Sequence, residues 1–238
     1  MASDKTDSTN ISIEELLEQF SSGSSRKQRA LIKSVESRSG EIASLETAAL
    51  APYDPQGDAW AACWILQVLK RHHPEGLRKL VPDDSSGWFD TPSEVGIDYA
   101  PFQDALLSES FEEADRFTSA VLRKLAGPSA ESRRYVYFSE VESIPGLDLC
   151  TLDRLWKAYS QGRFGFSIQA KLLKSLGGRY DRLWPRIGWK NDGIWTRYPN
   201  AFNWSIAAPE GHMPLVNQLR GVRLMDALLT HPALISRR

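Results

Sequence analysis

Apolar residues recur at helical spacing along most of this 238-residue chain, and no long alternating run of apolar and polar residues interrupts them. In residues 11–20, the apolar side chains at positions 13, 16, 17 and 20 share one helix face. Ser12 and Glu15 form the capping box expected at the start of such a helix. This spacing predicts an all-α protein.

The same reasoning divides the chain into two helical parts. The turn-rich, acidic segment 83–92 is the best linker candidate, so we expect an N-terminal bundle of short helices over 1–85 and a larger helical domain over 86–238. The connections 127–147 and 189–214 are long enough to be functional.

The helix predicted over 58–72 is expected to have Asp58 as its N-cap. The expected helices are 11–20, 25–37, 41–51, 58–72, 74–82, 99–107, 111–125, 148–159, 166–176, 181–188 and 215–229.

Composition excludes several classes of protein. The net charge of -1 gives no general attraction to nucleic acid or to an acidic membrane. Cys63 and Cys150 lie in apolar contexts, as expected for reduced cysteines of a cytosolic protein. No apolar run approaches the ~20 residues of a membrane span. The acidic start resembles neither a secretory signal nor a transit peptide, so we expect the whole chain to be the mature protein.

The sequence offers no catalytic constellation. It contains no His-x-x-x-His, Cys-x-x-Cys, Gly-x-Ser-x-Gly or phosphate-loop pattern, and its acidic residues form no evident pair. His212 could coordinate a metal, although a hydrogen-bonded loop histidine is the simpler interpretation. We therefore expect a protein that is not an enzyme and that holds neither a metal ion nor a catalytic cofactor.

Aromatic residues and arginines concentrate between residues 156 and 204, where five of the eight tryptophans lie. This mixture suits a concave surface for a flat, apolar ligand with a negative edge. In the predicted last helix, Asn217, Arg220 and Arg223 recur every three residues and could receive two carboxylates. A solvated basic face is the alternative for these three, and stacking on single-stranded nucleic acid or a protein-interaction surface is the alternative for the aromatics.

Several segments resemble, in order, the motifs of the genomes-uncoupled-four family, and they cover about residues 95–235. The long segment 152–169 (LDRLWKAYSQGRFGFSIQ) is the most specific of them. The acidic start and the short C-terminal end resemble the cyanobacterial type, which has a helical N-terminal domain. The other matching segments are 98–104, 113–118, 187–190, 195–199, 208–214 and 217–223.

The resemblance implies an all-α fold with long structured loops forming a cupped surface. It also implies a non-catalytic carrier that binds protoporphyrin IX and Mg-protoporphyrin IX and activates magnesium chelatase in chlorophyll biosynthesis. The expected partner is the large porphyrin-binding subunit of that enzyme, with no nucleic acid. We expect a cytoplasmic monomer with peripheral association at the thylakoid membrane.

The resemblance also suggests where the porphyrin lies. Asn217, Arg220 and Arg223 are assigned to its propionate edge, and the 136–138 segment, with Val136 and Phe138, to a facing flap. The axial ligand of a bound metal is left open between water and His212. The wall candidates are Trp189, Trp195, Arg197, Tyr198 and Phe164.

Overall fold

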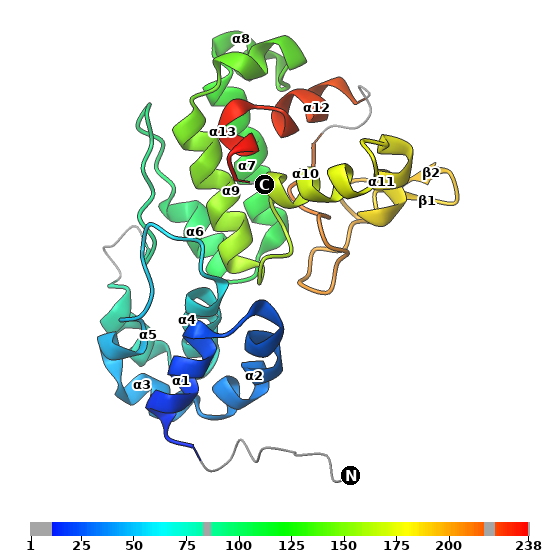
Figure 1. The fold of residues 1–238 in the computed structure, drawn as a ribbon. Coiled ribbons are helices and arrows are strands. Elements are labelled where there is room, and N and C mark those ends of the chain that lie inside the picture. Colours follow the sequence, from blue (N-terminus) through cyan, green and yellow to red (C-terminus); the bar gives the residue numbers. More distant parts are fainter. Residues whose placement is uncertain (1–10, 83–86, 217–221, 238) are drawn as a thin grey trace, which may run out of the picture.

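The computed structural model describes residues 11–82, 87–216 and 222–237. Within these ranges the chain forms helices and one two-strand hairpin, which confirms the all-α class (Figure 1). None of the described helices combines the length and apolar character needed to cross a membrane. The elements are α1 (Ile13–Ser22), α2 (Ser25–Ser37), α3 (Ser39–Ser44), η1 (Glu46–Ala49), α4 (Trp60–His72), α5 (Pro74–Leu80), α6 (Ala100–Leu107), α7 (Phe111–Leu125), α8 (Pro128–Arg133), η2 (Phe138–Ser143), α9 (Gly146–Tyr159), α10 (Phe166–Ser175), α11 (Tyr180–Arg186), β1 (Lys190–Asn191), β2 (Ile194–Trp195), α12 (Arg223–Leu229) and α13 (Pro232–Ile235).

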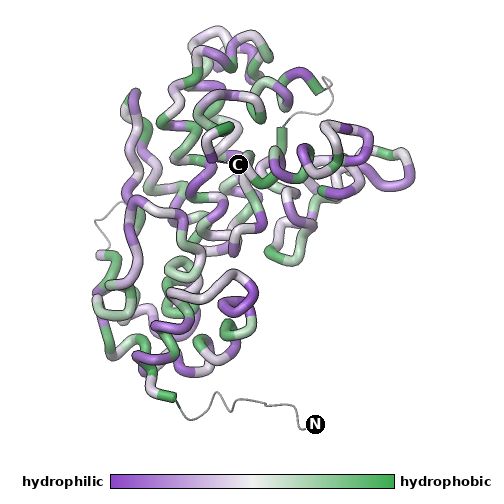
Figure 2. The backbone as a smooth tube through the Cα atoms, in the orientation of Figure 1, coloured by the Kyte–Doolittle hydropathy of each residue, from purple (hydrophilic) through white to green (hydrophobic). Residues whose placement is uncertain are grey.

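The helices form an elongated molecule with an arm. α1–α5 gather at one end, α6, α7 and α9 continue the long axis, and α10, α11 and the hairpin project to one side (Figure 1). Hydrophilic and hydrophobic residues alternate along most helices, as expected when each buries one face (Figure 2). Buried apolar side chains form one continuous cluster from α1 to α13. The division at residue 85 stays a prediction.

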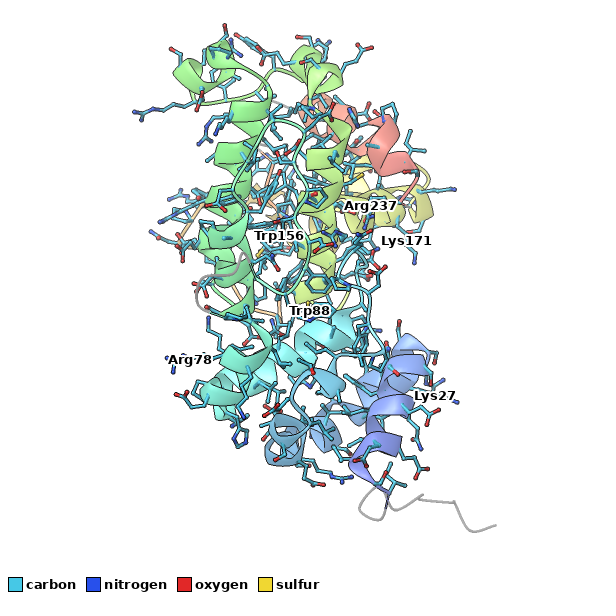
Figure 3. All side chains as sticks on the ribbon, turned by 90° about the vertical axis from the view of Figure 1, so that its left-hand side faces the viewer. Lys27, Arg78, Trp88, Trp156, Lys171 and Arg237 are labelled. Carbon is cyan, nitrogen blue, oxygen red and sulfur yellow. The ribbon has the colours of Figure 1, made fainter. Side chains whose placement is uncertain are left out.

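Aromatic packing between α7 and α9 forms the centre of the larger part. The Trp156 side chain lies between these two helices (Figure 3), and its indole N–H donates to Thr118 Oγ1 at 3.0 Å. Phe111 and Phe164 pack against the same indole. Tyr159, one turn further, is 1% exposed and donates its hydroxyl hydrogen to Gln103. The helical stripe of 148–159 is therefore scaffold, as its spacing predicts.

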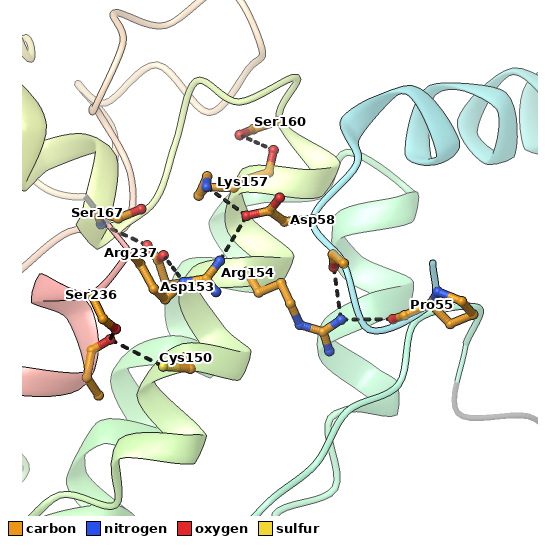
Figure 4. Close-up of polar contacts among 12 residues, drawn as sticks. Pro55, Asp58, Cys150, Asp153, Arg154, Lys157, Ser160, Ser167, Ser236 and Arg237 are labelled. Carbon is orange, nitrogen blue, oxygen red and sulfur yellow. Dashed lines mark hydrogen bonds and ion pairs between the residues drawn. The ribbon is translucent and has the colours of Figure 1, made fainter. Parts of the chain in front are cut away.

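A cluster of charges joins the N-terminal helices to the rest of the molecule (Figure 4). Asp58 accepts hydrogen bonds from Lys157 at 2.7 Å and from Arg237 at 2.9 Å, and Arg237 also contacts the buried Asp153 at 2.9 Å. We call Asp58, Asp153, Lys157 and Arg237 the charge clasp. Burial opposes ionisation of Asp58, but the hydrogen bond and charge of Lys157 and the charge of Arg237 outweigh it and lower the pKa of Asp58.

The predicted role of Asp58 as a helix cap was wrong. α4 begins at Trp60 with Ala59 at its N-cap and no side-chain cap, because the Asp58 carboxylate is engaged by α9 and the chain end instead. Nearby, Arg154 of α9 donates to the carbonyl oxygens of Pro55 and Gly57, which holds the same junction.

Four other predicted elements differ from the structure. The connection predicted over 127–147 contains the helices α8 and η2. The helix predicted over 41–51 is divided into α3 and η1 at Glu46, whose positive φ of 50° cannot continue a helix. The connection 189–214 contains a short hairpin turned by Asp192 and Gly193. The helix predicted over 215–229 begins, within the described residues, only at Arg223, and residues 215 and 216 are not helical.

Candidate functional site

A cavity of about 740 Å³ lies between α7, the connection before η2, the end of the hairpin and α12. This volume falls within the ~300–1,000 Å³ typical of small-molecule sites. Its lining is largely apolar and aromatic, with arginines, four hydroxyl-bearing side chains and one carboxyl. The lining residues are Asp115, Arg116, Ser119, Leu122, Arg123, Arg134, Tyr135, Val136, Ile144, Trp195, Thr196, Arg197, Tyr198, Leu215, Val216, Leu224 and Leu228.

α7 supplies one wall of the cavity, because one of its faces packs in the core and a neighbouring set of its residues lines the cavity. Acidic residues in its first turn and basic residues in its last complement the helix dipole. Phe111, Thr118 and Leu125 are buried against neighbouring helices. Residues 115, 119 and 122, at helical spacing, meet the cavity. The helix therefore carries both packing residues and residues that line the cavity.

A chain of tryptophan rings supports the opposite wall. Trp189 is fully buried and stacks on Trp184, with centroids 5.6 Å apart and planes 7° apart. Trp184 in turn contacts Trp195, at 5.5 Å between centroids, and Trp195 lines the cavity. The Trp189 indole donates to the carbonyl of His212 at 2.7 Å, which fixes the base of this chain. Only the outermost ring can meet a ligand.

Four arginines line the cavity: Arg116, Arg123, Arg134 and Arg197. Arg116 is paired with Glu112 at 2.6 Å and also contacts the Tyr198 side chain. A guanidinium matches a carboxylate with a fork of N–H donors, so this set favours a ligand with negative groups. Sequence reasoning identified Arg197 but missed the others. Arg116 and Arg123 are seven residues apart, so they share one face of α7, and this spacing could have indicated a basic face there.

Asp115 is the one acidic residue among the described residues that line the cavity. It is 1% exposed, and its Oδ1 accepts a hydrogen bond from the backbone N–H of Leu215 at 2.6 Å. Burial raises the pKa of Asp115 to about 7; the hydrogen bond from Leu215 opposes this shift, and the charge of Glu112 adds to it. Sequence reasoning also missed this residue.

The structure brings together some of the residues predicted for the site. Trp195, Arg197, Tyr198 and Val136 line the cavity. Arg223 and Phe138 lie outside its lining and contact each other, with the guanidinium carbon 5.4 Å from the ring centroid. They meet because the start of α12 packs on η2.

Other predicted residues lie elsewhere. Phe164 and Trp189 are fully buried core residues and do not line the cavity, because their rings pack against Phe111 and Trp184. Asn217 and Arg220 lie outside the described residues.

His212 also lies away from the cavity lining. Its Nδ1 donates to the carbonyl of Ile187 at 2.6 Å, and burial lowers its pKa. The described residues contain no group of three His, Cys, Asp or Glu side chains that could hold a metal ion.

A family model described as GUN4-like matches residues 92–232, which include every described residue of the cavity. The chain is 46% identical over 168 residues to the Ycf53-like protein of Synechocystis, covering 71% of this chain and 67% of that protein. It is 33% identical over 149 residues to the chloroplastic tetrapyrrole-binding protein of Arabidopsis thaliana, covering 59% of this chain and 56% of that protein.

Solved structures show the same likeness. GUN4 from Chlamydomonas reinhardtii matches with a TM-score of 0.58 and 40% identity, over 61% of this chain and 93% of that chain. Ligand-free GUN4 from Arabidopsis thaliana matches with a TM-score of 0.54 and 34% identity, over 58% of this chain and 99% of that chain. The family match covers more than half of the sequence, and the chain therefore belongs to the GUN4-like family.

Proposed function

We propose that this protein binds protoporphyrin IX and Mg-protoporphyrin IX in the cavity between α7 and α12. The observation that carries the proposal is the combination, in one cavity of about 740 Å³, of an apolar and aromatic lining with four arginines. A porphyrin is a flat apolar disc with two propionates on one edge, so it needs both kinds of surface. The Arabidopsis relative is named as a tetrapyrrole-binding protein, which supports this ligand class.

The proposed contacts follow from the chemistry of the lining. The disc would pack against Trp195 and Val136, and its propionates would be received by Arg197 and the α7 arginines. Arg223, which lies outside the lining, and Asn217 and Arg220, which lie outside the described residues, would be further donors. Burial of apolar surface contributes about 25 cal/mol per Å², so the disc supplies most of the affinity and the arginines set its orientation.

The biological role that we propose is a non-catalytic carrier that activates magnesium chelatase through the large porphyrin-binding subunit of that enzyme. The protein would present and receive porphyrins, and protein residues would perform no bond-making step. A monomer in the cytoplasm, with peripheral association at the thylakoid membrane, belongs to the same proposal. Sedimentation of the purified protein and fractionation of cells test the oligomeric state and the location.

A porphyrin titration followed by tryptophan fluorescence tests ligand binding. We expect saturable quenching with one porphyrin per chain, because Trp195 lines the cavity. Ser119→Trp places a large ring in the cavity and should abolish binding, whereas Ser37→Trp on the exposed face of α2 should leave it unchanged. Binding that is non-saturable, or equal in the two variants, would contradict the proposed site. Strong displacement of the porphyrin by single-stranded oligonucleotides would favour the nucleic-acid alternative.

A chelatase assay with and without the protein tests the proposed role. We expect the wild type and Ser37→Trp to increase the rate of magnesium insertion and Ser119→Trp to have no effect. Stimulation by Ser119→Trp would separate activation from porphyrin binding and refute the carrier mechanism.

A further inference from the structure

The segment from Met213 to Val216, which we call the cavity floor, ends in two of the residues that line the cavity. Leu215 and Val216 line the cavity, and the segment crosses between α10 and α7. On one side, Gly165 N–H donates to the Met213 carbonyl at 3.0 Å and Gln169 Nε2 donates to the Pro214 carbonyl at 2.9 Å. Both contacts fix the segment to the start of α10.

On the other side, the segment is held by Asp115. The Leu215 N–H donates to Asp115 Oδ1 at 2.6 Å, across 100 residues of sequence. An acid is unfavourable at a buried position of an amphipathic helix unless it is hydrogen-bonded. A backbone N–H that loses its acceptor in a buried setting is also costly. The two groups therefore satisfy each other, and the contact draws the segment against α7.

We propose that Asp115 is a positioning residue of the tetrapyrrole cavity, which fastens the backbone of Leu215 to α7 and thereby fixes the cavity floor. This inference rests on the proposed function for the identity of the ligand. α12 returns Leu224 and Leu228 to the same cavity.

A direct contact between Asp115 and the ligand is the competing role. Asp115 is 1% exposed, so little of its surface is open to a ligand, and its hydrogen bond points to the protein backbone. The roles differ in their response to substitution. Asp115→Asn retains an oxygen acceptor of the same shape without a charge, whereas Asp115→Ala removes the acceptor.

Amide hydrogen exchange in the ligand-free protein tests the contact itself. We expect the Leu215 amide to exchange about tenfold faster in Asp115→Ala than in wild type, and nearly as slowly as wild type in Asp115→Asn. Amides of α9 serve as the control for the fold. If Asp115→Ala does not fold, Asp115→Leu fills the volume without an acceptor and should show the same acceleration. Unchanged exchange at Leu215 in the folded acceptor-free variant would overturn the inference.

Porphyrin dissociation rates then connect the contact to the cavity. We expect porphyrin to dissociate about tenfold faster from the acceptor-free variant, because that variant has lost one hydrogen bond. In Asp115→Asn, which keeps the acceptor, the dissociation rate should change less than threefold. Equal losses in both variants would instead assign the carboxylate charge to the ligand and overturn the positioning role. If the wild type binds no tetrapyrrole, the proposed function fails, and the exchange experiment still tests the contact.

Discussion

The guanidinium of Arg223 lies over the ring of Phe138, with its carbon 5.4 Å from the ring centroid. Arg223 opens α12, and Phe138 opens η2, so the contact joins the start of α12, which contributes Leu224 and Leu228 to the cavity lining, to η2. A cation held over an aromatic face keeps its N–H donors free at the edges of the guanidinium. Arg223 is therefore oriented beside the cavity in the absence of ligand and remains able to bind a carboxylate.

Replacing Arg223 should show whether it receives a propionate. We expect Arg223→Ala to raise the dissociation constant for protoporphyrin IX by about tenfold, as for the loss of one charged hydrogen bond. Phe138→Ala should raise it less than about fivefold, because an exposed cation–π contact contributes only about 0.5–1 kcal/mol. Fluorescence titration measures both constants. An Arg223→Ala variant that binds like wild type would remove this residue from the site.

Two tryptophans of one aromatic chain should respond differently to truncation. Trp195→Ala should weaken porphyrin binding with a small effect on stability, because Trp195 is only partly buried and lines the cavity. Trp189→Ala should lower the free energy of unfolding by about 3–5 kcal/mol, since it removes a fully buried ring. Urea unfolding and porphyrin titration of both variants separate the effects. Equal binding losses at equal stability would place Trp189 in the wall after all.

Much of the architecture follows from local sequence. Periodicity locates most helices because each buries one stripe, as Leu16 and Phe20 do in α1. The break at Glu46 has no such signature, because a residue other than glycine there adopts positive φ. The hairpin had a signal, since Asp192-Gly193 is a common hairpin turn, but its strands of two residues are too short for an alternating pattern.

The site was less predictable because tertiary packing decides which rings are exposed. The resemblance suggested Trp189 and Phe164 as wall residues, yet both rings are covered by aromatics from other elements. Conversely, Arg116 and Arg123 look like an ordinary solvated face of α7. They become cavity residues because residues 195–198 and α12 lie opposite that face. Their spacing indicates a shared basic face of α7, but it does not indicate which elements pack opposite that face.

Breaking the charge clasp should destabilise the whole chain. Arg237→Ala removes the ion-pair partner of Asp153, whose side chain is 0% exposed and keeps the hydrogen bond from the Ser167 N–H, so we expect a loss of about 3 kcal/mol in the free energy of unfolding. Arg182→Ala, an exposed arginine on α11, is the matched control and should change stability by less than about 0.5 kcal/mol. Urea unfolding measures both. Equal stability of the two variants would show that the clasp contributes nothing.

The raised pKa of Asp115 predicts a specific dependence of stability on pH. Its folded pKa is about 7, against about 3.9 for an unfolded aspartate. Between these values the folded chain keeps a proton that the unfolded chain has lost. The contribution of this proton on Asp115 to the free energy of unfolding is therefore fully present below about pH 4. It is lost as pH rises through 7, at up to ~1.4 kcal/mol per pH unit. Asp115→Asn does not ionise, so wild type should lose about 2–3 kcal/mol relative to this variant between pH 5 and pH 8. Urea unfolding of both proteins at each pH measures the difference, in which all other titrating groups cancel. A difference that stays constant across this range would show that Asp115 ionises normally in the folded protein.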